Sequence, residues 1–254
     1  MIKDWLNANK LTVNIKKTNY ILFKSYKADE NHPDILFNNL TLNKVTETKF
    51  LGVILDDKLS WKSHMKFLEN KLSSANFIIQ KIRHKINKKL AFKLYDTLIL
   101  PYLNYCSVIW GRLKKTHIKR IECLQKRAIR VCSSRFDLGS KDLFAMAKKL
   151  PFEKLSIFAT LRLVHRYFYN PSTLPLSILS LFQKSTEVHQ HLTRSAVNLN
   201  LFSNYGRLDA RKNSIKIYAP MLWNSIPSRI RNVNSNFSFK IALKSHLFAS
   251  TFSV

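Results

Sequence analysis

The spacing of apolar residues in the first quarter of the chain is typical of short strands. One short helix is expected over residues 2–9, where Ile2, Trp5 and Leu6 share a face. Strands are then expected over LTVNIKKTNYILF and over the two short segments Ile35–Phe37 and Lys49–Leu55, separated by the turn region NNLTLN, because these stretches alternate and are rich in β-branched residues. A polar loop is expected over Lys24–Pro33. Since the chain opens inside an α/β unit with no earlier strand, this part is expected to be incomplete.

From residue 60 onward, apolar residues recur three and four positions apart, which is the period of an α-helix. The first helix is expected to have Ser60 as its N-cap. Its buried stripe comprises Trp61, Met65, Leu68, Leu72, Ala75, Ile79, Ile82 and Ile86. The opposite face is cationic and includes Lys62 and Lys66. A second helix is expected over Lys89–Leu100, with Pro101 interrupting it before the apolar run ends at Gly111.

The rest of the chain is also predicted to be helical. Helices are expected over Lys141–Leu150, over Phe152–Tyr169 and, after a connector at about residues 170–200, over Asn236–Phe248, where Ser235 is the expected N-cap. The pattern therefore predicts an α+β fold, with a small α/β part at 1–57, a helical domain at 58–150 and a helical C-terminal region at 151–254.

The net charge of the chain indicates which class of partner it binds. Its 254 residues include 43 Lys and Arg against 15 Asp and Glu, which gives a net charge of +28. Because 46% of the residues are hydrophobic, the chain is expected to fold around a core rather than to form a disordered basic tail. A folded domain this basic is typically neutralised by a polyanion, either nucleic acid or an anionic membrane surface.

The densest charge lies between residues 114 and 135. Eight basic residues and one acid, Glu122, share this stretch with apolar residues at helical spacing, which predicts a basic amphipathic helix. Such helices bind nucleic-acid backbones, anionic lipid surfaces or calmodulin-like grooves. Nucleic acid is favoured because the chain has no lipidation signal, and failure to float with anionic liposomes would exclude the membrane-surface alternative.

Several function classes are excluded by composition. The four glycines are far apart, so no phosphate-binding glycine loop is expected. The three cysteines form no CxxC pair, which argues against zinc and disulfide frameworks and favours a reducing compartment, the nucleus or the cytoplasm. No secretory signal and no membrane span are predicted.

Four motifs carry a family resemblance. They are NKLTVNIKKTNYILF after Trp5, KFLGVILDDKLSWKSHM, LYDTLILPYLNYCSVIWG and the closing YGRLDARKNSIKIYAPMLWNSIPSRIR. In this order they resemble the C-terminal part of the reverse transcriptase of non-LTR, jockey-like retrotransposons. The resemblance implies that 1–57 is a late part of the palm, 58–150 the thumb and 151–254 the tail that follows it.

The resemblance also implies roles for individual residues. Lys17 matches a palm lysine near the incoming triphosphate, which implies an auxiliary catalytic role; alternatively, it only shields a strand end. Phe50, Leu51 and Gly52 match the hairpin that holds the primer end, where Gly52 would supply a tight turn. The cationic helices would follow the phosphates of an RNA or DNA template–primer through Lys62, Lys66, Lys114, Lys115, Lys119, Arg120, Lys126, Arg127 and Arg130.

Asp56 and Asp57 superficially resemble the metal-binding pair of a reverse transcriptase. In the family this position follows the hairpin and precedes the thumb, whereas the catalytic aspartates belong to earlier segments. The two acids are therefore expected to favour the start of the next helix. No catalytic carboxylate, metal site or cofactor is expected in this chain, although the parent enzyme would use Mg²⁺, and the chain alone is predicted to be inactive as a polymerase.

Two functions follow from these observations. The first is a truncated RNA-directed DNA polymerase that binds template–primer and lacks the upstream polymerase segments. The second is a non-enzymatic basic nucleic-acid-binding protein, or a vestigial one, from a decayed element. Stable packing of residues 200–254 on the preceding helices would favour a selected module. The sequence makes no prediction of oligomeric state.

Overall fold

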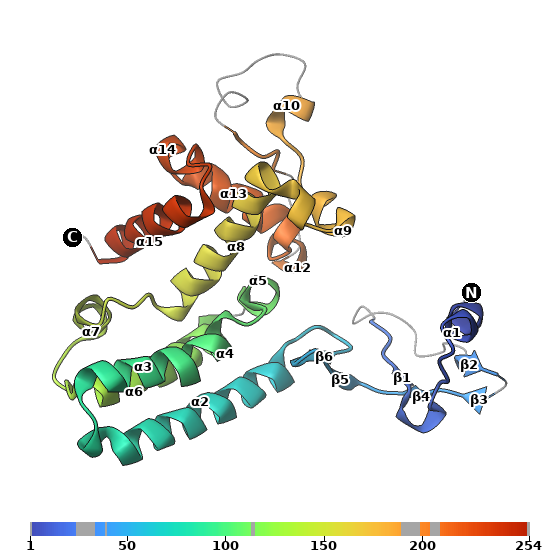
Figure 1. The fold of residues 1–254 in the computed structure, drawn as a ribbon, viewed down its shortest axis with the longest axis horizontal. Helices are drawn as coiled ribbons and strands as arrows, with labels where there is room; N and C mark the ends of the chain where they lie inside the picture. The colour runs from blue at the N-terminus through green and yellow to red at the C-terminus, as the bar shows by residue number, and fades with distance from the viewer. Residues whose placement is uncertain are drawn as a thin grey trace. The chain divides into compact units, whose positions relative to one another are not determined.

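A computed structural model describes residues 2–23, 34–38, 40–112, 115–188, 199–203 and 209–252 (Figure 1). The chain forms two compact units, Met1–Phe67 and Leu68–Val254. In the described part most residues are helical and the strands form three two-stranded sheets, so the α+β class is confirmed. The loop expected over Lys24–Pro33 lies outside the described residues, and the domain boundaries at 57 and 150 stay predictions.

The start of the first unit contains less strand than expected. Helix α1 (Ile2–Ala8) is followed by a 3-10 turn, η1 (Ile15–Lys17), and by β1 (Asn19–Tyr20), which pairs in parallel with β4 (Asn43–Lys44). The long strand expected from residue 11 to residue 23 is therefore wrong. The reason is local, because the Lys17 N–H bonds to the Asn14 carbonyl and the Thr18 N–H to the Ile15 carbonyl, which closes a turn in mid-segment.

Two hairpins complete the strands of this unit. Strand β2 (Leu36–Phe37) pairs antiparallel with β3 (Leu40–Thr41), and β5 (Glu47–Phe50) pairs antiparallel with β6 (Val53–Asp56). The expected turn region NNLTLN thus contributes β3, and the single strand expected over Lys49–Leu55 is wrong. The chain reverses there at Leu51 and Gly52, whose φ angles of 45° and 84° are the positive values that tight two-residue hairpin turns need.

A buried histidine joins the last hairpin to the first long helix, α2 (Lys62–Ile82). The backbone N–H of Ile54 in β6 donates to Nδ1 of His64 at 3.4 Å. Burial lowers the pKa of His64 to about 4, so the ring is neutral at neutral pH and can accept this bond.

Helix α2 buries the stripe that its sequence period predicts. Met65, Leu68, Leu72, Ala75 and Ile79 are all buried. Trp61, Ile82 and Ile86, at the ends of the predicted stripe, are only half-buried. Trp61 and Ile86 lie outside the α-helix, which ends before the 3-10 turn η2 (Arg83–Lys85). The predicted buried stripe is therefore confirmed for the central turns of α2.

The next apolar run is divided into three helices. They are α3 (Lys88–Leu98), α4 (Leu100–Asn104) and α5 (Ser107–Trp110). The side chain of Asn87 caps α3 by accepting from the Leu90 N–H at 2.8 Å. Pro101 interrupts the run as expected, and it lies in the first turn of α4, where its missing N–H costs no helical bond.

Three longer elements follow, of which α8 lies at the centre of the unit. They are α6 (Lys115–Ser133), α7 (Ser140–Met146) and α8 (Phe152–Tyr169), and α8 has the bounds predicted from the sequence. Helix α8 contacts α4, α5 and α6 on one side and α13 and α15 on another (Figure 1). Its buried residues are distributed around the helix, which explains why it can serve as the centre of the unit.

The C-terminal region is also built of helices. Its elements are η3 (Pro171–Thr173), α9 (Leu176–Leu179), α10 (Ser185–Val188), α12 (Asp209–Lys212), α13 (Ile215–Ser225), α14 (Ser228–Arg231) and α15 (Asn236–Phe252). Trp223 of α13 stacks on Phe168 of α8 with 5.2 Å between ring centroids, and Phe239 of α15 stacks on His165 at 4.0 Å. Helices α13 and α15 are thereby packed on α8.

Candidate nucleic-acid interface

The basic helix α6 has one buried and one exposed face. Ile121, Gln125 and Ala128 are fully buried. Lys119, Arg120 and Arg127 are exposed, together with Cys123 between them. Arg120, Cys123 and Arg127 are spaced three and four residues apart and Lys119 is adjacent to Arg120, so these positions form one stripe along the helix. We call Lys119, Arg120 and Arg127 the α6 cationic stripe.

Polar contacts hold α6 against α2. The Arg120 guanidinium is 4.0 Å from the Glu69 carboxylate, and the Arg127 guanidinium donates to the Gln80 side-chain oxygen at 3.4 Å. Between them, the Asn76 amide donates to the Leu124 carbonyl at 3.1 Å. The residue numbers of the partners increase together along α2 and α6, so the two helices run in the same direction. The Arg120 side chain remains 70% exposed, and an ion pair that solvent reaches so freely neutralises little of its charge.

Two predicted contact residues have structural partners. Lys126 donates to the Ser140 hydroxyl at 3.2 Å, and Arg130 donates to the Leu138 carbonyl at 3.3 Å. Both side chains are half-buried and connect α6 to the start of α7. Lys114 and the side chain of Lys115 lie outside the described residues. Of the remaining predicted contact residues of α6, the three of the α6 cationic stripe are exposed.

The acid of this helix does not lie in the stripe. One carboxylate oxygen of Glu122 accepts from the Glu153 backbone N–H at 3.4 Å, at the start of α8. Burial is the main cause that raises the pKa of this carboxyl group. Glu122 is thus directed to the helix packing, and the α6 cationic stripe keeps its net positive charge.

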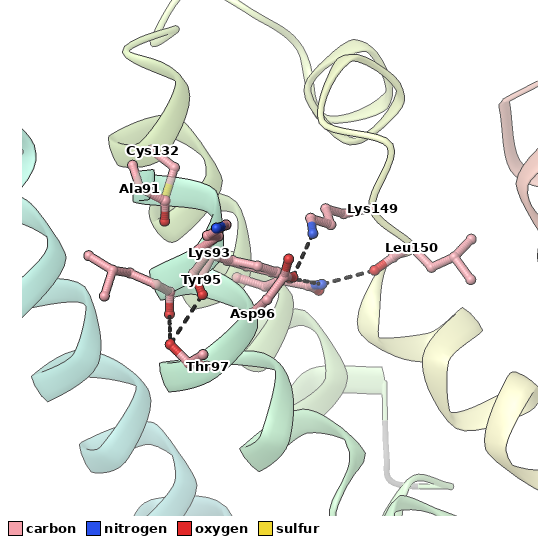
Figure 2. A network of polar contacts seen from close by, with 10 residues as sticks. Ala91, Lys93, Tyr95, Asp96, Thr97, Cys132, Lys149 and Leu150 are labelled. Atoms are coloured by element: carbon pink, nitrogen blue, oxygen red, sulfur yellow. Dashed lines mark hydrogen bonds and ion pairs between the residues drawn. The ribbon is translucent and has the colours of Figure 1, made fainter. Parts of the chain in front are cut away.

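A buried glutamine, which apolar spacing and charge do not reveal as a functional residue, positions α6. The Gln125 amide donates to the Tyr95 hydroxyl and to the Leu150 carbonyl, each at 2.9 Å, and joins α6 to α3 and to the segment before α8. Tyr95 and Leu150 of this network are labelled in Figure 2. Burial raises the pKa of Tyr95, so its hydroxyl stays neutral. In the sequence, the sign of this role is that the polar Gln125 lies on the same helical face as Ile121 and Ala128.

The candidate residues of the first unit are mostly exposed. Phe50 and Leu51 at the hairpin turn expose 62% and 74% of their surface, which is unusual for large apolar side chains. Lys62 and Lys66 are exposed in the first turns of α2, and Lys17 is exposed at the end of η1. The hairpin therefore presents two apolar side chains to solvent, where a ligand or partner can reach them.

Asp56 organises the start of α2. Its two carboxylate oxygens accept from the backbone N–H groups of Ser60 and Trp61, each at 2.8 Å. Ser60, the expected N-cap, makes only a 3.5 Å contact with the Lys62 N–H, so Asp56 supplies the stronger bonds. Both carboxylate oxygens of Asp56 thus bind backbone N–H groups at the start of α2, as expected for an acid that favours this helix start. No group of three or more His, Cys, Asp or Glu within the described ranges could hold a metal ion.

Replacing Asp56 with Ala is expected to destabilise the first unit by about 1–2 kcal/mol, because two backbone N–H groups lose a charged acceptor. Asp57→Ala is the matched control, since no hydrogen bond of its carboxylate is found among the described residues, and it should change stability by less than about 0.5 kcal/mol. Urea unfolding of both variants measures the difference. Equal effects would contradict the capping role of Asp56.

No helix of the described part is both long and apolar enough to cross a membrane.

Comparisons with known proteins agree with the motifs. The RNA-directed DNA polymerase from mobile element jockey of Drosophila funebris is 26% identical over 135 residues, which are 52% of this chain and 14% of that protein. The probable RNA-directed DNA polymerases from transposon X-element and transposon BS of Drosophila melanogaster are 23% and 28% identical over 131 and 134 residues, in each case 50% of this chain and 14% of the relative.

The chain therefore matches a small part of each relative's length. No protein-family model and no solved structure matches it. Over about half of its own length, the chain is related in sequence to the RNA-directed DNA polymerases of non-LTR retrotransposons.

Proposed function

We propose that this chain is the late palm, thumb and tail of a non-LTR retrotransposon reverse transcriptase and that it binds an RNA or DNA template–primer duplex. The observation that carries the proposal is the α6 cationic stripe, with Glu122 directed away to α8. Phosphates follow a duplex at regular intervals, and a rigid helix with exposed cations can contact several of them at once.

In this proposal, binding and catalysis reside in different segments. Phe50, Leu51 and Gly52 would hold the primer end, with Lys62 and Lys66 contacting phosphates nearby. Lys17 would act as an auxiliary residue near the triphosphate. The catalytic carboxylates and their Mg²⁺ would come from upstream polymerase segments, since Asp56 is engaged at the start of α2.

Affinity for an RNA–DNA duplex is expected to fall steeply with salt and to change little with sequence. If on the order of four phosphates are contacted, raising salt from about 50 to about 200 mM lowers the affinity roughly 100-fold, because bound counterions are released. Fluorescence anisotropy with duplexes of two unrelated sequences measures both effects. A flat salt dependence, or binding of one sequence only, would contradict the proposed phosphate contacts.

The alternative function is that of a non-enzymatic basic module derived from such an element. The packing of α13 and α15 on α8 favours a folded module over an unfolded relic, because Trp223 and Phe239 are fully buried there. This alternative shares the nucleic-acid surface with the first proposal and differs in its independence from polymerase segments. Recovery of primer extension on adding the upstream segments would support the first proposal over the second.

A further inference from the structure

A cavity of about 610 Å³ lies within the helical unit, among α3, α4, the segment before α8, α8 itself and α15. One acid, Asp96, lines it together with five basic residues, which are Lys148, Lys149, Arg162, Lys240 and Lys244. Cavities of roughly 300–1,000 Å³ are the size that small ligands occupy. The lining gives this cavity a marked positive charge.

Only one of the five cations is neutralised. Lys149 pairs with Asp96 at 2.5 Å, as Figure 2 shows. Within the described part of the chain, the other four make no ion pair. Unpaired cations gathered in a concave site attract anions strongly, because the low-dielectric walls weaken the screening by water.

Arg162 contributes a half-buried guanidinium to the cavity wall. Its Nε atom is buried and has no hydrogen-bond acceptor among the described residues. Burial, and secondarily the charge of Arg166, lowers the pKa of Arg162, although the group remains charged at neutral pH. The guanidinium of Arg162 therefore brings a positive charge to the cavity wall, where an anionic oxygen can pair with it.

The remaining wall of the cavity is apolar. Leu150, Leu155 and Ile241 contribute to it, and the half-buried Phe158 ring lies 5.8 Å from the Arg162 guanidinium. Nucleobases stack on aromatic rings and on guanidinium planes, and single-strand binding sites combine such stacking surfaces with cationic rims. A cavity of about 610 Å³ is of the size that a single nucleotide, rather than a duplex, would occupy.

We propose that this cavity binds one nucleotide of a single-stranded RNA or DNA segment, with its phosphate at Lys240, Lys244 and Arg162 and its base against Phe158. The proposal rests on the proposed function, because it adds a second nucleic-acid contact to that of the α6 cationic stripe. The two contacts differ in kind, since the stripe contacts duplex phosphates and the cavity takes an unpaired nucleotide.

The test compares Lys240→Glu/Lys244→Glu with Lys216→Glu/Arg229→Glu, a control that has the same charge change at exposed positions of α13 and α14. The cavity variant is expected to bind a fluorescein-labelled oligouridylate at least about tenfold more weakly and a duplex within about twofold of the unmodified chain. The control should bind both normally. Equal single-strand affinity of the two variants would overturn the cavity site.

Two further measurements keep the proposal independent of variant folding. Ultraviolet crosslinking of a 5-iodouridine oligonucleotide to the unmodified chain should give adducts within residues 148–162 or 240–244, and adducts confined to α6 would overturn it. Uridine monophosphate should compete only weakly with the labelled oligouridylate. Competition as strong as that of the unlabelled oligonucleotide would mean that the cavity binds a free nucleotide, and the single-strand proposal would be overturned. If the unmodified chain binds no nucleic acid at all, the proposed function fails. If it binds the duplex but the cavity variant binds the oligouridylate as tightly as the control does, only the cavity proposal fails and the proposed function stands.

Discussion

Lys119→Glu/Arg120→Glu/Arg127→Glu is expected to lower the affinity for a template–primer duplex at least about 100-fold at about 50 mM salt, because three phosphate contacts become repulsive. The slope of log affinity against log salt should also shrink by about 2.7. Anisotropy titrations over a range of salt concentrations measure both quantities. Lys126 and Arg130 are left unchanged because their side chains are half-buried and bond to Ser140 and Leu138, whereas Arg120 and Arg127 are exposed and their contacts with Glu69 and Gln80 are longer.

The control for this variant has the same change in charge elsewhere in the helical unit. Lys141, Lys216 and Arg229 are exposed on α7, α13 and α14. Their combined replacement with Glu should weaken duplex binding by less than about fivefold, through long-range electrostatics alone. If the control loses as much affinity as the stripe variant, net charge rather than α6 governs binding, and the assigned interface is wrong.

Trp223→Ala is expected to destabilise the helical unit by about 3–5 kcal/mol. The Trp223 side chain is fully buried, stacks on Phe168 and donates from Nε1 to the Leu199 carbonyl at 2.8 Å. Its removal leaves a large cavity between α13 and α8 and also deprives the Leu199 carbonyl of its indole donor. Urea unfolding followed by far-ultraviolet circular dichroism measures the loss.

Met221 provides the control on the same helix. It is 58% exposed, so Met221→Ala should change stability by less than about 0.5 kcal/mol. An equally small effect of Trp223→Ala would mean that α13 does not share a core with α8. That result would remove the support for a folded C-terminal module.

Helix positions were the most predictable part of the fold. The bounds of α8 and the buried centre of α2 follow from apolar spacing, because an α-helix repeats every 3.6 residues regardless of its neighbours. The strands of the first unit were poorly predicted, since a strand depends on a partner that apolar alternation does not identify. Apolar alternation alone predicts one strand over Lys49–Leu55, and only the family resemblance places the turn at Gly52, which the pairing of β5 with β6 confirms.

The candidate interface was only partly predictable for a related reason. Counting charges identified α6 as a basic amphipathic helix, but it could not separate the exposed Lys119 from Lys126, which bonds to Ser140. That distinction depends on which neighbour lies within reach of each side chain. Asp56 was predicted to favour the start of α2, and the two backbone bonds at Ser60 and Trp61 confirm it.

The sequence by itself determined the net charge, the helical character of most of the chain and its relation to non-LTR retrotransposon polymerases, because composition, local periodicity and short motifs are properties of the linear chain. Only the tertiary structure decided which cations stay open to a ligand and that Asp96, Lys149, Arg162 and Lys244 line one cavity. These residues come from α3, the segment before α8, α8 and α15. Burial and long-range packing bring them together, and neither can be read from spacing along the chain.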